Sequence, residues 1–204
     1  ISAQPGSAPD KTNIEVQVVE QSTGDISFGA GFSTTSGILG DISIKERNLL
    51  GKGQELRFGV SLGTLSTLID LSFTEPYFLD RPMAAGFDIF RTSNDRQAIA
   101  SYSDRSIGFS LRAGWAYSEF IRQSVRYTLR QTDIYNVQPW ASWVVQANAG
   151  TSVVSEVSET LSWDTRDTRL NTTKGFLLRN SQAVAGMIGT EQYYRTTLDA
   201  VYYQ

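Results

Sequence analysis

Residues 106–130, SIGFSLRAGWAYSEFIRQSVRYTLR, indicate the fold most clearly. Large apolar residues alternate there with small or polar ones on both sides of a short connection, Ser118 to Phe120. Such alternation is typical of β-strands with one apolar and one polar face, and the short connection predicts an antiparallel hairpin. Each strand is close to the roughly 9–11 residues that a tilted strand needs to cross a bilayer, whereas strands of globular proteins usually have about 5–6 residues.

The same alternation continues through most of the chain from Asp25 onward and predicts about ten strands. Their polar faces carry mainly glycine, serine and arginine, which suits a water-filled lumen. We therefore expect an all-β fold, part of an antiparallel up-and-down transmembrane β-barrel. Aromatic residues lie near the strand ends, where a barrel has its two interfacial girdles: Tyr77, Phe78, Trp115, Tyr117, Phe120, Trp163 and Tyr202.

Residues 137–150 interrupt this pattern and predict one short helix inside a long loop. Gly150 is placed like a helix C-cap, and the apolar residues recur at helical spacing: Trp140, Trp143, Val144 and Ala147. Earlier in the chain, the polar run S-N-D-R-Q at 93–97 predicts a loop.

The first 23 residues form a separate unit. Ile14 begins an alternating segment that ends at Glu20 and is followed by the linker Q-S-T-G. Upstream, Pro5, Gly6, Ser7 and Pro9 are typical of a loop. We expect residues 1–23 to be the end of a preceding domain with its linker, and residues 24–204 to be the barrel part.

Composition narrows the functional classes. The 204 residues carry a net charge of −3 and no basic patch, so nucleic acid is not an expected partner. The absence of His and Cys excludes histidine bases, thiol nucleophiles and most zinc sites, so we expect no cofactor, no metal and no enzymatic activity. No apolar run is long enough for a transmembrane helix, and the N-terminus lacks a signal-peptide pattern. The mean hydropathy of −0.23 is compatible with a β-barrel, where only alternate residues face lipid.

The turn FTEPYFLD at 73–80 follows a strand that Pro76 prevents from continuing. Three large apolar residues follow the proline, Tyr77, Phe78 and Leu79. They suit a membrane interface, or alternatively a water-soluble core or a protein partner. The strand that ends at Glu75 is the fourth from the linker, so in an up-and-down barrel with a periplasmic N-terminus this turn lies on the periplasmic side.

Several motifs, taken in order, resemble the BamA family of outer-membrane protein assembly factors, its alphaproteobacterial members in particular. The motifs are GDISFGAGFSTTSG at 24–37, NLLGKG at 48–53, FTEPYFLDRP at 73–82, WDTRDTRLNTTKG at 163–175 and GTEQYYR at 189–195. The resemblance implies that residues 14–20 end the fifth POTRA domain and that residues 24–204 form the first ten of sixteen strands. The family's R-G-F/Y loop and closing strand would follow Gln204.

The resemblance further implies an insertase that folds β-barrel proteins into the Gram-negative outer membrane through a lateral seam, without ATP. Its implied partners are unfolded outer-membrane β-barrel clients, accessory periplasmic lipoproteins and outer-membrane lipid. The first strand is the candidate site, because its edge can pair with an incoming strand. The residues are Ile26, Ser27, Phe28, Gly29, Ala30, Gly31 and Phe32. Gly29 and Gly31 either weaken this strand or simply fit a crowded interior.

Charged residues leave further alternatives. Asp164 and Asp167 resemble a catalytic carboxylate pair, but with Arg166 and Arg169 they more readily form a turn that pairs its own charges. Other residues of the polar faces favour structural ion pairs: Asp41, Lys45, Arg57, Asp70 and Asp88. A passive or two-partner secretion channel is the alternative function, with anion preference set by Arg112, Arg122, Arg126 and Arg130. A water-soluble β-sandwich is a third possibility.

Overall fold

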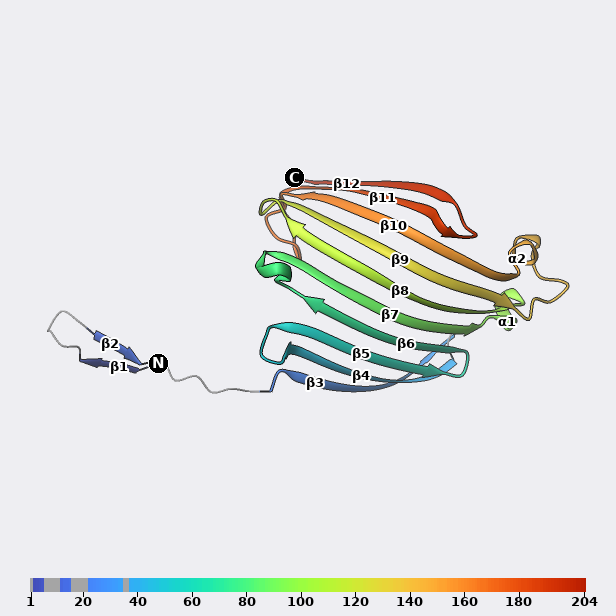
Figure 1. The fold of residues 1–204 in the computed structure, drawn as a ribbon, viewed down its shortest axis with the longest axis horizontal. Helices are drawn as coiled ribbons and strands as arrows, with labels where there is room; N and C mark the ends of the chain where they lie inside the picture. Colours follow the sequence, from blue (N-terminus) through green and yellow to red (C-terminus); the bar gives the residue numbers. More distant parts are fainter. Residues whose placement is uncertain (1, 6–11, 16–21, 35–36) are drawn as a thin grey trace.

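The computed structural model describes residues 2–5, 12–15, 22–34 and 37–204. Its main feature is a ten-stranded antiparallel sheet in the order β12-β11-β10-β9-β8-β7-β6-β5-β4-β3 (Figure 1). Every strand pairs with its neighbours in the sequence, so the sheet is an up-and-down meander. This confirms the all-β prediction and the number of strands.

The strands are long, in agreement with the alternation in the sequence. They are β3 (Gly24–Ser33), β4 (Gly37–Leu49), β5 (Gln54–Gly63), β6 (Ser66–Glu75), β7 (Met83–Asp95), β8 (Ser103–Ala116), β9 (Ile121–Tyr135), β10 (Gly150–Asp164), β11 (Gly175–Gly189) and β12 (Tyr193–Tyr203). We call the end of the sheet where β3 begins the proximal end. The opposite end, which carries the helices α1 and α2, is the distal end (Figure 1).

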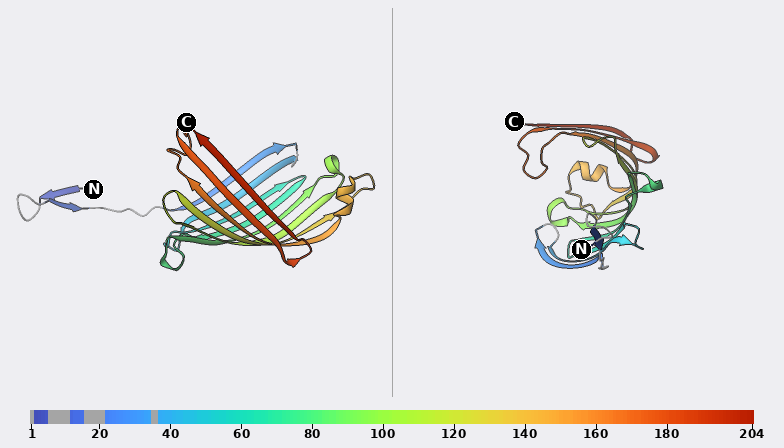
Figure 2. Two further views of the ribbon diagram at one scale, coloured as in Figure 1. Left: turned by 90° about the horizontal axis from the view of Figure 1, so that it is seen from above. Right: turned by 90° about the vertical axis from the view of Figure 1, so that its left-hand side faces the viewer.

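The sheet bends into an open trough, and α2 lies on its concave side (Figure 2). The polar residues of the alternating pattern face this side, since Arg130, Thr132 and Glu191 share a hollow with Ala147 of α2. The large apolar residues consequently occupy the convex face, where Phe28 and Phe32 are about three-quarters exposed. Of the described apolar residues only four are buried: Ala141, Val154, Ala183 and Ala185. An apolar surface of this extent requires a non-aqueous or protein neighbour.

The structure changes some details of the prediction. The helix in the long loop is α2 (Trp143–Ala147), which Asn148 ends, whereas Gly150 is the first residue of β10 and not the C-cap. The loop predicted at 93–97 is wrong in its extent, because residues 93–95 end β7 and a second helix, α1 (Gln97–Ala100), begins two residues later. It is held by Asp95, whose Oδ1 accepts from the N–H of Gln97 at 2.9 Å. Four residues are too few to show helical periodicity in a sequence.

A separate two-stranded sheet pairs β1 (Ser2–Pro5) with β2 (Thr12–Glu15). The expectation of a loop at Pro5 is therefore wrong, because a proline is tolerated on the edge of a sheet. Residues 6–11 and 16–21, which include the rest of the predicted loop and strand, lie outside the described residues. No helix in the described part of the chain is long and apolar enough to span a membrane.

Candidate functional site

Strand β3, the candidate site, forms one edge of the sheet. It pairs with β4 from Gly24↔Glu46 to Ser33↔Gly37, and within the described residues no strand covers its other edge. All of its residues except Ser33 are exposed. The structure thus brings Ile26, Ser27, Phe28, Gly29, Ala30, Gly31 and Phe32 together along one accessible edge.

The two central glycines of β3 have different surroundings. A Cβ atom added to Gly29 would lie 2.3 Å from Oδ1 of Asp41, the residue directly opposite on β4. At Gly31 the nearest atom, Cδ1 of Leu39, would be 3.8 Å away, which is ordinary contact. Gly29 is therefore explained by packing of the Asp41 carboxylate, whereas packing does not require a glycine at position 31.

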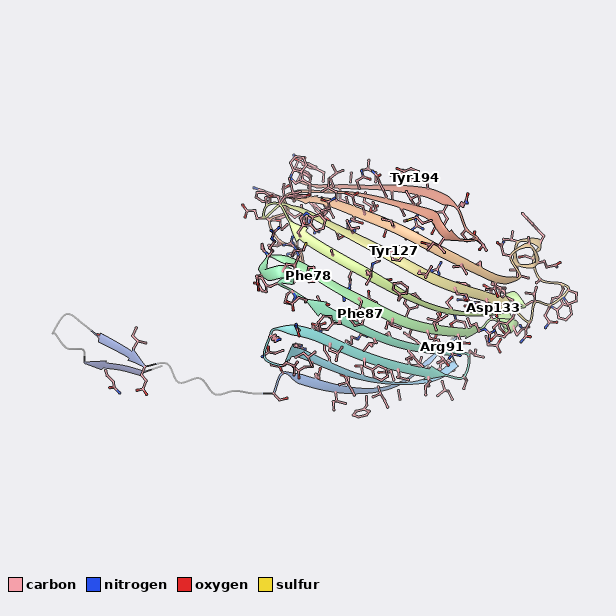
Figure 3. The ribbon with its side chains drawn as sticks, viewed as in Figure 1. Phe78, Phe87, Arg91, Tyr127, Asp133 and Tyr194 are labelled. Carbon is pink, nitrogen blue, oxygen red and sulfur yellow. The ribbon has the colours of Figure 1, made fainter. Side chains whose placement is uncertain are left out.

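The turn after β6 contains a short 3-10 helix, η1 (Phe78–Asp80), at the proximal end (Figure 3). Glu75 initiates the turn, because its Oε1 accepts from the N–H of Tyr77 at 2.9 Å after Pro76 has ended the ladder. Tyr77 and Leu79 are about 70% exposed and Phe78 is 41% exposed. The predicted aromatic turn is therefore accessible.

The two aromatic side chains of this turn lie on different sides of the sheet. Tyr77 lines a hollow of about 550 Å³ with residues of the concave face such as Arg122. Phe78 instead lines a hollow with Phe73 and Phe87, which stack at 5.6 Å. The turn therefore presents apolar surface both at the mouth of the trough and outside it.

The concave wall is tied together by an ion-pair cluster that we call the Asp88 clasp: Asp88, Arg112 and Arg126. Oδ2 of Asp88 is 3.3 Å from Nε of Arg112 and 3.1 Å from Nη1 of Arg126. Nη2 of Arg112 also donates to Phe73 O, Ser72 Oγ and Thr74 Oγ1 at 2.8–3.1 Å. The clasp thereby connects β6, β7, β8 and β9.

Gly86 makes this arrangement possible. It pairs with Arg112 in the register, and a Cβ added to it would lie 3.1 Å from Nη2 of Arg112 and 2.2 Å from Phe73 O. The guanidinium group therefore passes over a position without a side chain to reach β6.

The ion pairs expected on the polar faces form in part. Asp88 pairs with Arg112 and Arg126, and Lys45 pairs with Glu55 at 3.2 Å. Asp41, Arg57 and Asp70 form no ion pair within the described ranges. Two of the four arginines proposed for anion preference thus share the single negative charge of Asp88, while Arg122 and Arg130 have no ion-pair partner in the described part of the chain.

The charged loop after β10 pairs its own charges, as predicted. Nε and Nη2 of Arg166 donate to the two carboxylate oxygens of Asp164 at 2.8 and 2.9 Å. Asp167 accepts from the hydroxyl of Thr173 at 2.5 Å and from the N–H groups of Thr173, Lys174 and Thr168. These donors, the Thr173 hydroxyl first, hold the pKa of Asp167 well below its ordinary range. The two carboxylates therefore act as separate loop anchors.

No group of three or more Asp and Glu residues in the described ranges could hold a metal ion. Sequence reasoning predicted an ion pair for Asp88 but missed its partners, because no local spacing relates Asp88 to residues 24 and 38 positions later.

Known proteins are similar to this chain in sequence. A model of the Omp85 superfamily domain matches residues 48–204. The outer membrane protein assembly factor BamA of Neorickettsia risticii is 25% identical over 187 residues, which cover 92% of this chain and 25% of that protein. The sorting and assembly machinery component 50 homolog of Bos taurus is 26% identical over 179 residues, which cover 86% of this chain and 36% of that protein. The chain thus spans about a quarter of the BamA relative and about a third of the bovine one.

A solved structure shows the same fold. The crystal structure of BamA from Haemophilus ducreyi lacking POTRA domains 1-3 superimposes with a TM-score of 0.71 at 23% identity, covering 87% of this chain and 36% of that one. The relatives are named for assembly, in agreement with the expectation that the chain is not an enzyme. Because the family model covers most of the sequence, the chain belongs to the Omp85 superfamily.

Proposed function

We propose that the chain is part of an outer-membrane insertase, in which β3 offers its open edge to β-strands of client proteins. The observation that carries the proposal is that β3, the first strand of the sheet and exposed at all but its last residue, lies next to an apolar convex face in a member of a superfamily whose relatives are named as assembly factors. Residues 24–204 would be the first ten strands of a sixteen-stranded barrel, and residues 1–23 the end of a periplasmic POTRA domain with its linker.

The proposed step is β-augmentation. In hydrocarbon an unpaired N–H or C=O group costs several kcal/mol, so an open strand edge favours a pairing partner strongly. A client strand that pairs with β3 satisfies these groups on both chains without covalent chemistry. Strand β3 suits a reversible pairing, because its side chains are exposed and its centre carries Gly29 and Gly31.

The proposal also orients the protein. With the N-terminus in the periplasm, the proximal end and its turns face the periplasm, and Tyr77, Phe78 and Leu79 lie at the inner-leaflet boundary as anchors. The partners are unfolded β-barrel clients, accessory periplasmic lipoproteins at the proximal end, and outer-membrane lipid along the convex face.

Site-specific photo-crosslinking tests the role of β3. A photoreactive amino acid replaces Ser27 in the natural protein, and a second variant carries it at Ser61 of β5, which also lies on the concave face but is flanked by strands on both sides. During assembly of a barrel client, we expect crosslinks from position 27 at several times the yield from position 61. Equal yields during productive assembly would contradict the proposal.

A passive channel is the second candidate, favoured by Arg122 and Arg130, which have no ion-pair partner in the described part of the concave wall. If the protein is an anion-preferring pore, Arg122→Glu should shift the reversal potential in planar bilayers towards cations. Arg126 is a poorer probe, because a carboxylate there would also face Asp88 and disturb the clasp.

A further inference from the structure

The convex face changes from apolar to polar within three rows of paired residues near the distal end of β6–β9. The first row is Leu71, Ile89, Phe109 and Leu129, and it is entirely apolar. The next row towards the distal end is Ile69, Arg91, Ile107 and Gln131, and the third is Thr67, Ser93, Arg105 and Asp133. In a membrane-spanning barrel, such a change marks the boundary between hydrocarbon and headgroups.

Two arginines face outward at this boundary. Arg91 and Arg105 lie on adjacent strands at diagonal positions, because Arg91 pairs with Ile107 and Arg105 lies two residues before Ile107 on β8. They line one hollow of about 190 Å³ together with Ser106, Ile107, Gln131 and Asp133. Figure 3 labels Arg91 and Asp133 in the distal half of the sheet.

The two guanidinium groups differ in their protein partners. Arg105 is oriented by Asp133, at 2.8 Å from Nη2 and 3.0 Å from Nε, and it lies over the ring of Tyr135 at 5.3 Å. Arg91 is exposed and forms no ion pair or hydrogen bond within the described ranges. The hollow therefore retains one uncompensated positive charge next to an oriented guanidinium fork, the geometry that favours phosphate.

We propose that this hollow, the Arg91–Arg105 cradle, binds the phosphate of an anionic membrane lipid whose acyl chains lie against the adjoining apolar row. The inference rests on the proposed membrane-spanning function. Charge and apolarity together select a lipid: Arg91 supplies the counter-charge, and Ile89, Phe109 and Leu129 supply the surface for the chains. An arginine at this depth that lacks a protein anion is stabilised by a headgroup phosphate.

Lipid retention in the natural protein tests the cradle. The protein is purified in detergent, incubated with phosphatidic acid or phosphatidylcholine, and the bound lipid is counted by native mass spectrometry. We expect Arg91→Gln to weaken retention of phosphatidic acid about tenfold, the scale of one lost charge-assisted hydrogen bond, and to leave phosphatidylcholine unchanged. The matched control Arg57→Gln removes an arginine of the concave face that forms no ion pair within the described ranges, and it should retain phosphatidic acid like the wild type.

Each outcome decides the proposal. Equal retention of phosphatidic acid by wild type and Arg91→Gln overturns the proposal. Displacement of the lipid by millimolar inorganic phosphate also overturns it, because the hollow would then be a site for free anions. If Arg91→Gln yields no folded protein, Arg91→Met removes the same charge and keeps an apolar stem, and unchanged retention of phosphatidic acid in that variant counts against the cradle. Client assembly is measured on the same samples. A wild type without assembly activity overturns the proposed function, whereas the lipid comparison still decides the cradle.

Discussion

Gly29 and Gly31 of β3 provide a matched pair of substitutions on the concave face. An added Cβ at Gly31 meets only Leu39 at 3.8 Å, so it causes no clash. Alanine in a strand interior is favoured over glycine by roughly 0.5–1 kcal/mol. We therefore expect Gly31→Ala to raise the free energy of unfolding by about that amount.

At Gly29 the same methyl group would lie 2.3 Å from Oδ1 and 2.7 Å from Oδ2 of Asp41, so the carboxylate must rotate away. Moving a side chain about 30° from its preferred rotamer costs about 0.5–1.5 kcal/mol. The two terms nearly cancel, and we expect Gly29→Ala to be about 1 kcal/mol less stable than Gly31→Ala. Replacing the carboxylate in Asp41→Ser should remove this difference.

Urea unfolding in lipid vesicles, followed by tryptophan fluorescence, measures both effects. A double-mutant cycle of Gly29→Ala with Asp41→Ser should give a coupling energy of about 1 kcal/mol. The control cycle of Gly31→Ala with Asp41→Ser should be additive within about 0.3–0.5 kcal/mol. A coupling at Gly29 as small as that of the control cycle would refute the packing explanation for this glycine.

Three further perturbations probe the turns and the wall. Asp88→Asn should lower the free energy of unfolding by about 1–3 kcal/mol, measured by urea unfolding, whereas Asp70→Asn, which breaks no ion pair in the described ranges, should have little effect. The pKa of Asp167 is lowered in the folded protein, so its stabilising contribution is present above the ordinary carboxyl pKa and is lost as the pH falls through the folded value. The difference in unfolding free energy between wild type and Asp167→Asn should therefore be constant from about pH 7 to 5 and shrink below about pH 4. Leu50 has φ of 55°, a left-handed conformation that strains a residue with a side chain, and the residue is 82% exposed. Leu50→Gly should therefore raise the free energy of unfolding by about 1 kcal/mol in the same assay. A lower free energy of unfolding would contradict the presence of strain at Leu50.

The sheet could be predicted from sequence because the two faces of each strand have different neighbours. A strand that separates water from a non-aqueous phase must alternate along its whole length, and residues 106–130 carry that signal without interruption. The short helices gave weaker signals. The helix α1 depends on Asp95 and on a hydrogen bond from Gln97 to the carbonyl of Asn136, a contact between two loops that local sequence does not encode.

The candidate site was predictable only in part. The strand order alone predicts that the edge residues of β3 lie together. The different surroundings of Gly29 and Gly31 depend on the side chain opposite each glycine, which can be identified only when the pairing register of β3 with β4 is known. The partners of Asp88 in the clasp were missed for the same reason. Arg112 reaches Asp88 from a diagonal position on the neighbouring strand, since the residue directly opposite Asp88 is Ser110.

The Asp88 clasp also divides the sheet mechanically. Side-chain bonds connect β6 through β9, whereas the bonds described between β3 and β4 are those of the backbone ladder, next to a bond from Thr23 to Glu46 at the proximal end. Bending of the sheet should therefore be easier at β3 and β4 than across β6 through β9, where the bonds of the Asp88 clasp must break first.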